Sequence, residues 1–166
     1  RILAQVNADR RMIVIAHPDR GIWTKKVHEE AADFLVGSRS LQHDGSPIQP
    51  TRAVSGQRGE LFIADERPNS ARIVLWDITA GKMDMIREGN MKIAAMIIDS
   101  NGNLYVADDR SDAVLRYHTT SQQWTTSGNP LAGGGIRHIT GLAVDIGGKW
   151  FLSYYSDMRL SDHYLA

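Results

Sequence analysis

A short apolar run that ends in acidic residues occurs twice in this chain, and this repetition constrains its fold more than any other feature. Residues 61–66 read "LFIADE" and residues 104–109 read "LYVADD". When these runs are aligned, "IVIAH" at 13–17 and "WFLSY" at 150–154 fall into the same register. Self-similarity at this spacing indicates several copies of one supersecondary unit that stack on each other.

Each copy of the run also has the same surroundings. An apolar segment and a polar turn precede it, as in "IAAMIIDSNG" at 93–102. Glycine in such a turn supplies the positive φ angle that a tight hairpin needs, so each unit is predicted to begin with two antiparallel strands. Two further short runs follow each copy and supply a third and a fourth strand. The strands predicted for the best-defined unit are 93–98, 104–107, 114–117 and 123–126.

Four short strands per unit predict an all-β fold, a β-propeller built of four-stranded antiparallel blades, with about three and a half blades present. The second strand is apolar on both sides, as expected of sheets stacked face to face. Phe62 and Tyr105 hold the same place in the register, so both are predicted to be buried between blades. A helix competes with a strand only at 25–37. The predicted domain is a single partial propeller over 1–166, with blades at about 1–40, 48–89, 91–129 and 136–166.

Composition and charge exclude several classes of protein. Lys+Arg and Asp+Glu each number 19, so no basic excess points to nucleic acid. The chain has no cysteine, which excludes disulfides and thiol chemistry. No apolar run is long enough to span a membrane, and no signal-like start is visible. We therefore expect a soluble chain with no nucleic-acid partner and no membrane span, and the compartment stays unknown.

The segment 93–119 resembles an NHL repeat. It has a small residue before an apolar strand, a D-x-x-G-N turn, a Tyr-Val-Ala-Asp strand and an apolar strand that ends in an aromatic residue. The copy at 51–77 is similar but lacks the acid-led turn, and the outer copies replace the aspartate by His17 and Tyr154. The resemblance implies a propeller of the NHL type, or of the related gluconolactonase and strictosidine-synthase type.

The number of blades leaves the ring open. An open ring exposes sheet edges and apolar blade faces, so something must cover them. The chain could be part of a longer protein with further blades, could associate with other chains, or could close as a compact four-bladed ring.

The loops between the second and third strands are the first candidates for a binding site. They read "HPDRG" at 17–21, "DERPNSA" at 65–71, "DDRSDA" at 108–113 and "YSDMRL" at 155–160, each with an acid and an arginine. One interpretation is a polar rim that binds a ligand, or a divalent cation held by Asp65 and Asp108. The other is that each aspartate serves its own turn while the arginine pairs locally.

Residues that break the repeat are the better candidates for function, together with a histidine beside the glycine-rich loop at 131–138. His17, His43 and His138 would form a three-histidine metal site if they converged. The segment 36–50 is longer than the other connections and is either disordered or an insertion that contacts a partner. No catalytic residue is identified. The candidate ligand-binding residues are His17, Asp65, Glu66, Asp108, His138, Tyr154 and Tyr155.

Two classes of function follow. The first, which we favour, is a binding or assembly module that presents loops to a protein or small ligand and needs no cofactor. The second is a metal-dependent hydrolase or lyase of the gluconolactonase and strictosidine-synthase class, with one divalent cation at the mouth of the channel. The expected partner of a binding module is another protein or further blades of a longer chain.

Overall fold

The computed structural model describes residues 3–7, 12–26, 33–126, 137–156 and 163–165. Among these residues every regular element is a strand, apart from the single 3-10 turn η1 at Ser38–Ser40. The chain divides into two compact units, Arg1–Gly89 (unit 1) and Asn90–Ala166 (unit 2). No helix in the described part of the chain is long and apolar enough to cross a membrane.

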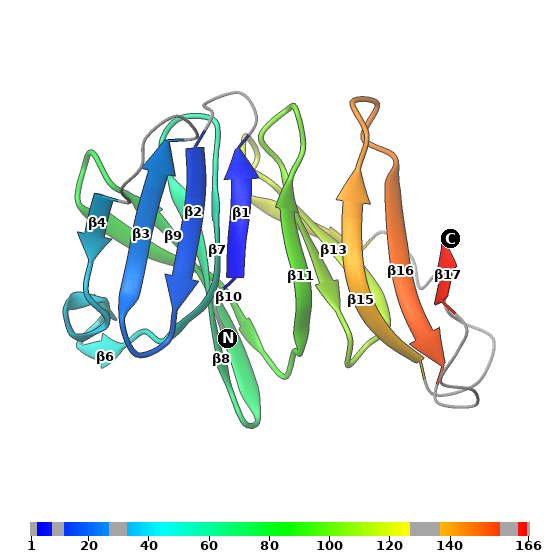
Figure 1. Ribbon diagram of the computed structural model, residues 1–166, viewed down its shortest axis with the longest axis horizontal. Helices are drawn as coiled ribbons and strands as arrows, with labels where there is room; N and C mark the ends of the chain where they lie inside the picture. The colour runs from blue at the N-terminus through cyan, green and yellow to red at the C-terminus, as the bar shows by residue number, and fades with distance from the viewer. Residues whose placement is uncertain (1–2, 8–11, 27–32, 127–136, 157–162, 166) are drawn as a thin grey trace. The chain divides into compact units, whose positions relative to one another are not determined.

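Unit 1 contains two four-stranded antiparallel sheets and one small hairpin (Figure 1). The first sheet has the order β1-β2-β3-β4, and the second has the order β10-β9-β8-β7. Strand β7 contacts β1 and β2, so the second sheet packs through its first strand on the first sheet. The bounds are β1 Leu3–Asn7, β2 Met12–His17, β3 Gly21–Lys26, β4 Asp33–Val36, β7 Pro50–Ser55, β8 Leu61–Arg67, β9 Ser70–Asp77 and β10 Lys82–Gly89.

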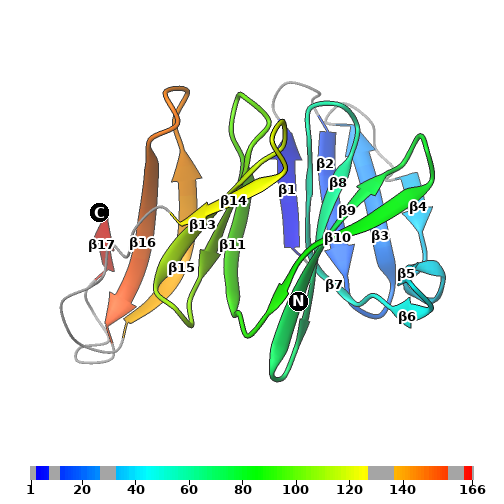
Figure 2. The same ribbon diagram turned by 180° about the vertical axis from the view of Figure 1, so that it is seen from behind.

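Unit 2 contains a four-stranded sheet and a three-stranded sheet, whose strands are seen from both sides in Figures 1 and 2. The order β11-β12-β13-β14 confirms the four successive antiparallel strands predicted for the best-defined unit. The last sheet has the order β15-β16-β17, and β15 packs on β11 and β12. The bounds are β11 Ile93–Ile98, β12 Leu104–Asp108, β13 Ala113–His118, β14 Gln123–Thr126, β15 Arg137–Val144, β16 Trp150–Ser156 and β17 His163–Leu165.

The turn between the first and second strands has the same hydrogen bonds in both sheets of unit 2. Asp99 O accepts from Gly102 N at 3.0 Å, and Asp145 O accepts from Gly148 N at 3.0 Å. Gly102 and Gly148 have φ angles of 82° and 80°, and neither residue before them has a positive φ. The turns are therefore three-residue loops with one left-handed residue, which only glycine adopts without strain. This differs from the tighter turn that Asn-Gly and Gly-Gly pairs predict.

The same β-bulge recurs in three of the described sheets. The register of the first two strands shifts between Pro50 and Arg52, between Ile93 and Ala95, and between Ile139 and Gly141. A bulge adds one unpaired residue and increases the local twist of the strand. Its repetition at one place shows that the copies share backbone geometry as well as sequence.

The cores lie between the sheets of each unit. In unit 1, Val14 and Ile22 of the first sheet pack in one cluster with Ile63 and Val74 of the second. In unit 2, Tyr105 packs in one cluster with Leu152 and other residues of the last sheet. The predicted burial of Phe62 and Tyr105 is confirmed, because 0% and 1% of their surfaces are exposed.

The long connection at 36–50 is a folded part of unit 1, so the interpretation of this segment as disordered is wrong. After η1 it forms the hairpin β5 (Gln42–His43) and β6 (Ser46–Pro47). Asp44 and Gly45 turn this hairpin with φ angles of 49° and 73°. Leu41 and Ile48 are 0% exposed and belong to the core of the unit. Two buried apolar side chains hold the connection in place, and the length of the segment alone did not reveal them.

The competing helix at 25–37 is absent from the part of that segment that the structure describes. Strand β3 ends at Lys26, and Asp33–Val36 forms the strand β4, as the repeat register predicts. Residues 27–32 lie outside the described residues. In the described part of this segment, pairing within the sheet therefore determines the secondary structure, although the spacing of its apolar residues also fits a helix.

Candidate functional site

Four candidate residues hold one equivalent place in the repeat, at the end of the second strand. Asp65, Asp108 and Tyr154 each pair with the first residue before the bulge in the preceding strand. His17 ends β2 in the same way. We call this place the strand-end position. The loop that leads to the third strand starts here, so these side chains are placed to act either in that loop or on a ligand.

His17 and Asp108 serve the turns that follow them. The backbone N–H of Asp19 donates to His17 Nδ1 at 3.2 Å, and the N–H of Arg110 donates to Asp108 Oδ1 at 3.0 Å. Asp108 also accepts from the N–H of Lys92 at 2.8 Å and from the hydroxyl of Ser111 at 2.5 Å. The ring nitrogen of His17 thus makes the same contact as the aspartate oxygen, to the residue two positions later. His17 breaks the sequence repeat, but it still accepts the hydrogen bond that Asp108 accepts in the equivalent turn.

Asp65 forms a buried ion pair instead. Its side chain is 0% exposed, and Oδ2 accepts from Arg72 Nε at 2.8 Å and from Arg72 Nη2 at 2.5 Å. Arg67 Nη2 lies 3.4 Å from the same oxygen. Asp65 Oδ1 has no hydrogen-bond partner in the described part of the chain. A buried carboxylate is tolerated here because the guanidinium beside it carries the opposite charge.

The same two arginines hold the folded connection of unit 1. The carbonyl oxygen of Pro47 accepts from Arg72 Nη2 at 2.5 Å and from Arg67 Nη2 at 2.9 Å. Asp65 therefore orients guanidinium groups that fix a segment about twenty residues earlier in the chain. This arrangement gives Asp65 a structural role that Asp108 does not have.

Glu66 and Tyr154 are also engaged by their own units. Glu66 Oε2 pairs with Nη1 of Arg52, and both side chains are mostly buried. Tyr154 is partly buried and packs against the core cluster of unit 2. For Tyr155 only the backbone is described, which pairs with His138 on one side and His163 on the other. These contacts connect the candidates to neighbouring strands.

Asp109 is the centre of a polar cluster in unit 2. Its Oδ1 accepts from the backbone N–H of Ile139 at 2.7 Å, and its Oδ2 lies 2.6 Å from Lys92 Nζ and 3.2 Å from His138 Nδ1. The Asp109 side chain is 4% exposed. It joins the start of β11 to the start of β15, and it places His138 on the surface of the same cluster.

These contacts determine the charge state of Asp109. Burial alone would raise the pKa of this carboxyl group, but the hydrogen bonds from Lys92, Ile139 and His138 and the charge of Lys92 outweigh it. The pKa of Asp109 is therefore held below its usual value of 3.8. Asp109 is an anion throughout the neutral range and is best described as a fixed negative group.

We expect the stability of unit 2 to depend on Asp109 at acid pH. A depressed folded-state pKa contributes stability that is fully present above the unfolded-state pKa and is lost as pH falls through the folded-state pKa. Urea unfolding should therefore show that the native chain has a higher free energy of unfolding than Asp109→Asn, and that this difference in free energy shrinks below about pH 3.8. A difference that stays constant from pH 6 to about pH 2 would contradict this role.

The candidate residues are not brought together as a metal site in the part of the chain that is described. No group of three or more His, Cys, Asp or Glu side chains there could hold a metal ion. His43 lies near the acid of its own hairpin, with Nδ1 3.6 Å from Asp44 Oδ2. His17 and His43 belong to unit 1, whereas His138 belongs to unit 2. A metal site made of these three histidines therefore stays a hypothesis.

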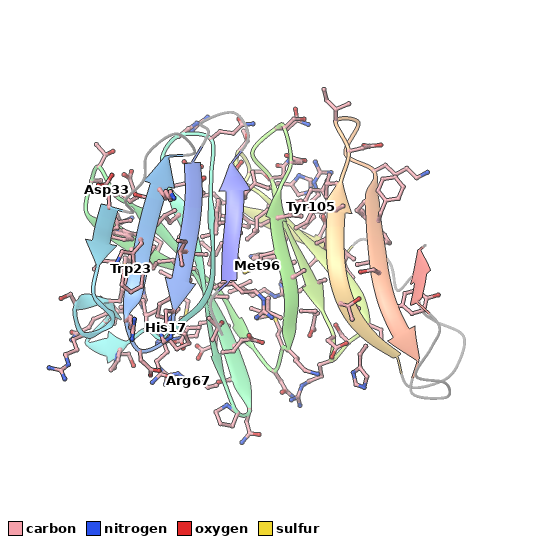
Figure 3. All side chains as sticks on the ribbon, viewed as in Figure 1. His17, Trp23, Asp33, Arg67, Met96 and Tyr105 are labelled. Carbon is pink, nitrogen blue, oxygen red and sulfur yellow. The ribbon has the colours of Figure 1, made fainter. Side chains whose placement is uncertain are left out.

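The loops after the strand-end position carry exposed arginines in three successive sheets. They are Arg20, Arg67 and Arg110, and Arg67 is the one that also pairs with Asp65. Within the described residues, the side chains of Arg20 and Arg110 make no hydrogen bond or ion pair. Figure 3 shows His17 and Arg67 at the same end of unit 1. Within the described residues the loop arginine therefore pairs locally in the case of Arg67 and not in the cases of Arg20 and Arg110, and Arg159 of the fourth loop lies outside these residues.

Three residues of these clusters were missed by the sequence analysis. Arg72 and Lys92 lie outside the loops that were searched, and Asp109 was treated only as the acid that closes the repeated run. The sequence signal for these clusters is the pair of adjacent acidic residues at 65–66 and at 108–109. In both sheets the second acid pairs with a cation near the first strand, Arg52 for Glu66 and Lys92 for Asp109.

Comparisons with known proteins agree with this architecture. No protein-family model matches the chain, and no curated protein sequence matches it. The chain is similar in structure to TolB from Acinetobacter baumannii, with a TM-score of 0.69 and 12% identity over 100% of this chain and 40% of TolB. It is also similar to a proposed gluconolactonase, with a TM-score of 0.62 and 17% identity over 90% of this chain and 56% of the other.

A third similar structure is the Dos1 propeller, with a TM-score of 0.59 and 14% identity over 98% of this chain and 44% of that one. At such identities the likeness shows the fold alone. The chain has the fold of a β-propeller built of four-stranded antiparallel blades, and it spans 40% to 56% of the length of these three solved structures.

Proposed function

We propose that this chain is a binding or assembly module, an NHL-type β-propeller segment that binds an acidic partner through the loops after its second strands. The observation that carries the proposal is the pair of exposed arginines, Arg20 and Arg110, whose side chains make no hydrogen bond or ion pair among the described residues. The acids and the histidine beside them already serve the fold.

The chemistry of arginine supports an acidic partner. Its guanidinium group presents a planar set of donors that matches carboxylate and phosphate groups, and it stays charged at all physiological pH values. Asp65 and Asp108 are 0% and 3% exposed, and neither forms an ion pair with Arg20 or Arg110 among the described residues. Arg20 and Arg67 lie in loops of unit 1 and Arg110 lies in a loop of unit 2, so each unit by itself offers arginine to an acidic segment of a protein.

Charge reversal at these loops tests the proposal. The probe is fluorescent poly-L-glutamate, titrated with the chain at low ionic strength. We expect Arg20→Glu and Arg110→Glu each to weaken binding about tenfold, because an attraction becomes a repulsion. Arg58→Glu is the matched control, since Arg58 is exposed in the loop before β8, at the other end of the strand from the loop that carries Arg67.

Equal losses in all three variants would show that the probe reads net charge only and would contradict the proposed site. Unchanged binding in Arg20→Glu and Arg110→Glu would contradict it as well. Poly-L-lysine serves as the probe of opposite charge and should not bind to the native chain.

A metal-dependent hydrolase or lyase is the second candidate function, suggested by the proposed gluconolactonase among the solved structures with this fold. Such a site would draw Asp65, Asp108 and His17 toward one divalent cation. The ion pair of Asp65 opposes this, because the guanidinium of Arg72 occupies the place of a cation beside the carboxylate. Metal analysis of the purified chain tests this candidate, and one tightly bound divalent ion per chain would favour it over the binding module.

A further inference from the structure

The loop that carries Arg20 is a closed turn. The backbone N–H of Arg20 donates to the carbonyl oxygen of His17 at 3.2 Å, which closes a β-turn over residues 17–20. Pro18 occupies the second position of this turn, where its restricted φ angle suits the common turn types. A second hydrogen bond, from the backbone N–H of Asp19 to His17 Nδ1, holds the ring of His17 against the same turn. The turn therefore fixes where the side chains of His17 and Arg20 leave the backbone.

The hydrogen bond within this turn also determines which nitrogen of His17 can act on a ligand. Nδ1 accepts the N–H of Asp19 and so carries no hydrogen, which places the hydrogen of the neutral ring on Nε2. The ring is partly exposed, and within the described residues it makes no other hydrogen bond or ion pair. An ionised aspartate at the equivalent place, such as Asp108, offers only acceptors. His17 therefore supplies a donor that Asp65 and Asp108 do not.

Arg67 presents a second donor group, whose orientation is fixed by the fold. Its Nη2 donates to the carbonyl oxygen of Pro47 at 2.9 Å and lies 3.4 Å from Asp65 Oδ2. The side chain is nevertheless 42% exposed. A guanidinium group carries five donors in one plane, so it can be held through one edge and bind an anion through another. Holding the group in place before binding lowers the entropy cost of binding a partner.

His17 and Arg67 lie at the same end of unit 1, as Figure 3 shows. The folded connection links the two loops that carry them. Its turn η1 contacts β3, which follows the turn of His17, and it also contacts β6. Pro47 of β6 in turn accepts the hydrogen bond of Arg67. The two loops therefore belong to one folded end of the unit.

The charges of these two loops favour an anionic ligand. Their acids are Asp19, Asp65 and Glu66. Asp65 and Glu66 each already pair with an arginine of a neighbouring strand, and both are mostly or fully buried. Asp19 is exposed and sets one negative charge against the positive charges of Arg20 and Arg67. Positive charge therefore predominates on the exposed part of the two loops.

Building on the proposed function, we infer that these two loops of unit 1 form one site for a segment that carries carboxylate groups. Arg20 and Arg67 supply the positive charge, and the Nε2–H group of His17 donates a hydrogen bond to a carboxylate oxygen. His17 determines the specificity of this site, because an aspartate in its place would keep the turn but would repel the same carboxylate.

The first test titrates fluorescent poly-L-glutamate with the chain at low ionic strength and about pH 8, where ordinary imidazole rings are neutral. His17→Asn keeps a side-chain acceptor for the turn and removes the Nε2–H group, so it should weaken binding about tenfold. Arg67→Ala should weaken binding by about the same factor. The matched controls, which should bind like the native chain, are His118→Asn and Arg58→Ala. His118 ends β13 at the opposite end from Asp108, and Arg58 lies in the loop before β8.

The ring of His17 provides a second test, on the native chain. Nitrogen-15 NMR of the imidazole rings should show the hydrogen of His17 on Nε2, and this resonance should shift when poly-L-glutamate is added. The ring resonances of His118 should not shift. A hydrogen on Nδ1 of His17, or a His17 resonance that does not respond to the probe, would overturn the inference.

Arg20→Glu separates the failure of this site from the failure of the proposed function. If Arg20→Glu weakens binding while His17→Asn and Arg67→Ala bind like the native chain, the two-loop site is wrong and the proposed function stands. If Arg20→Glu also binds like the native chain, the proposed function fails in unit 1 and the site fails with it. Far-UV circular dichroism checks that each variant is folded, and the NMR test on the native chain decides if His17→Asn is not.

Discussion

Tyr105→Ala is expected to lower the free energy of unfolding by about 3–5 kcal/mol, the range for removing a buried aromatic side chain. Tyr105 is 1% exposed and packs between the two sheets of unit 2, so its removal leaves a cavity that neighbouring residues cannot fill. Phe62→Ala should have a similar effect in unit 1, because Phe62 holds the same place and is 0% exposed. Urea unfolding followed by circular dichroism measures both.

Tyr105→Phe is the matched control for the hydroxyl group. Burial raises the pKa of Tyr105, the charge of Arg116 lowers it, and the charge of Asp99 and a hydrogen bond to its carboxylate raise it further. Losing this single hydrogen bond should cost about 1 kcal/mol, well below the effect of losing the ring. If Tyr105→Ala and Tyr105→Phe were equally stable, the ring would not be a packing element between the sheets.

Removing one member of the Asp65–Arg72 ion pair is expected to have an effect of the same size. Arg72→Ala leaves a fully buried carboxylate with only the more distant Arg67, and it should destabilise the chain by about 3–5 kcal/mol. Arg67→Ala is the matched control. Its side chain is 42% exposed, so we expect a loss of about 1 kcal/mol or less.

The double variant Asp65→Leu with Arg72→Met distinguishes a buried charge from a lost contact. Replacing both members by apolar residues leaves no unpaired charge, so most of the stability should return. The unfolding free energies of the native chain, Asp65→Leu, Arg72→Met and the double variant form a cycle that measures the coupling. A double variant as unstable as Arg72→Ala would mean that the contact with Pro47, and not the charge of Asp65, is the main contribution of Arg72.

The fold could be predicted from the sequence because the repeat encodes it locally. The continuous apolar run around Tyr105 and a glycine at position 102 determine a hairpin with little help from the rest of the chain. The register then transfers the strands to the weaker copies, including β4, where the apolar spacing alone also fits a helix. The burial of Leu41 and Ile48 could not be predicted, since it depends on the space between two sheets that a short sequence window does not describe.

The candidate site was predicted less well, for a physical reason. Sequence shows which residues break the repeat, but it does not show which atoms they contact. His17 breaks the repeat and still supplies the hydrogen bond of the aspartate it replaces. Asp65 keeps the repeat and makes different contacts, because Arg72 of the next strand reaches it. The Asp65 contact runs across strands to Arg72, and the loop sequence at 65–71 does not contain this partner.

One titration tests most directly whether the loop arginines, and not a metal held by the acids, bind the partner. Fluorescent poly-L-glutamate is titrated with the native chain and with the double variant Arg20→Glu and Arg110→Glu, each with and without a chelator of divalent cations. The expected result is that the chelator leaves the affinity of the native chain unchanged and that the double variant loses binding in both conditions. Binding that requires a divalent cation and survives the double charge reversal would contradict the proposed function.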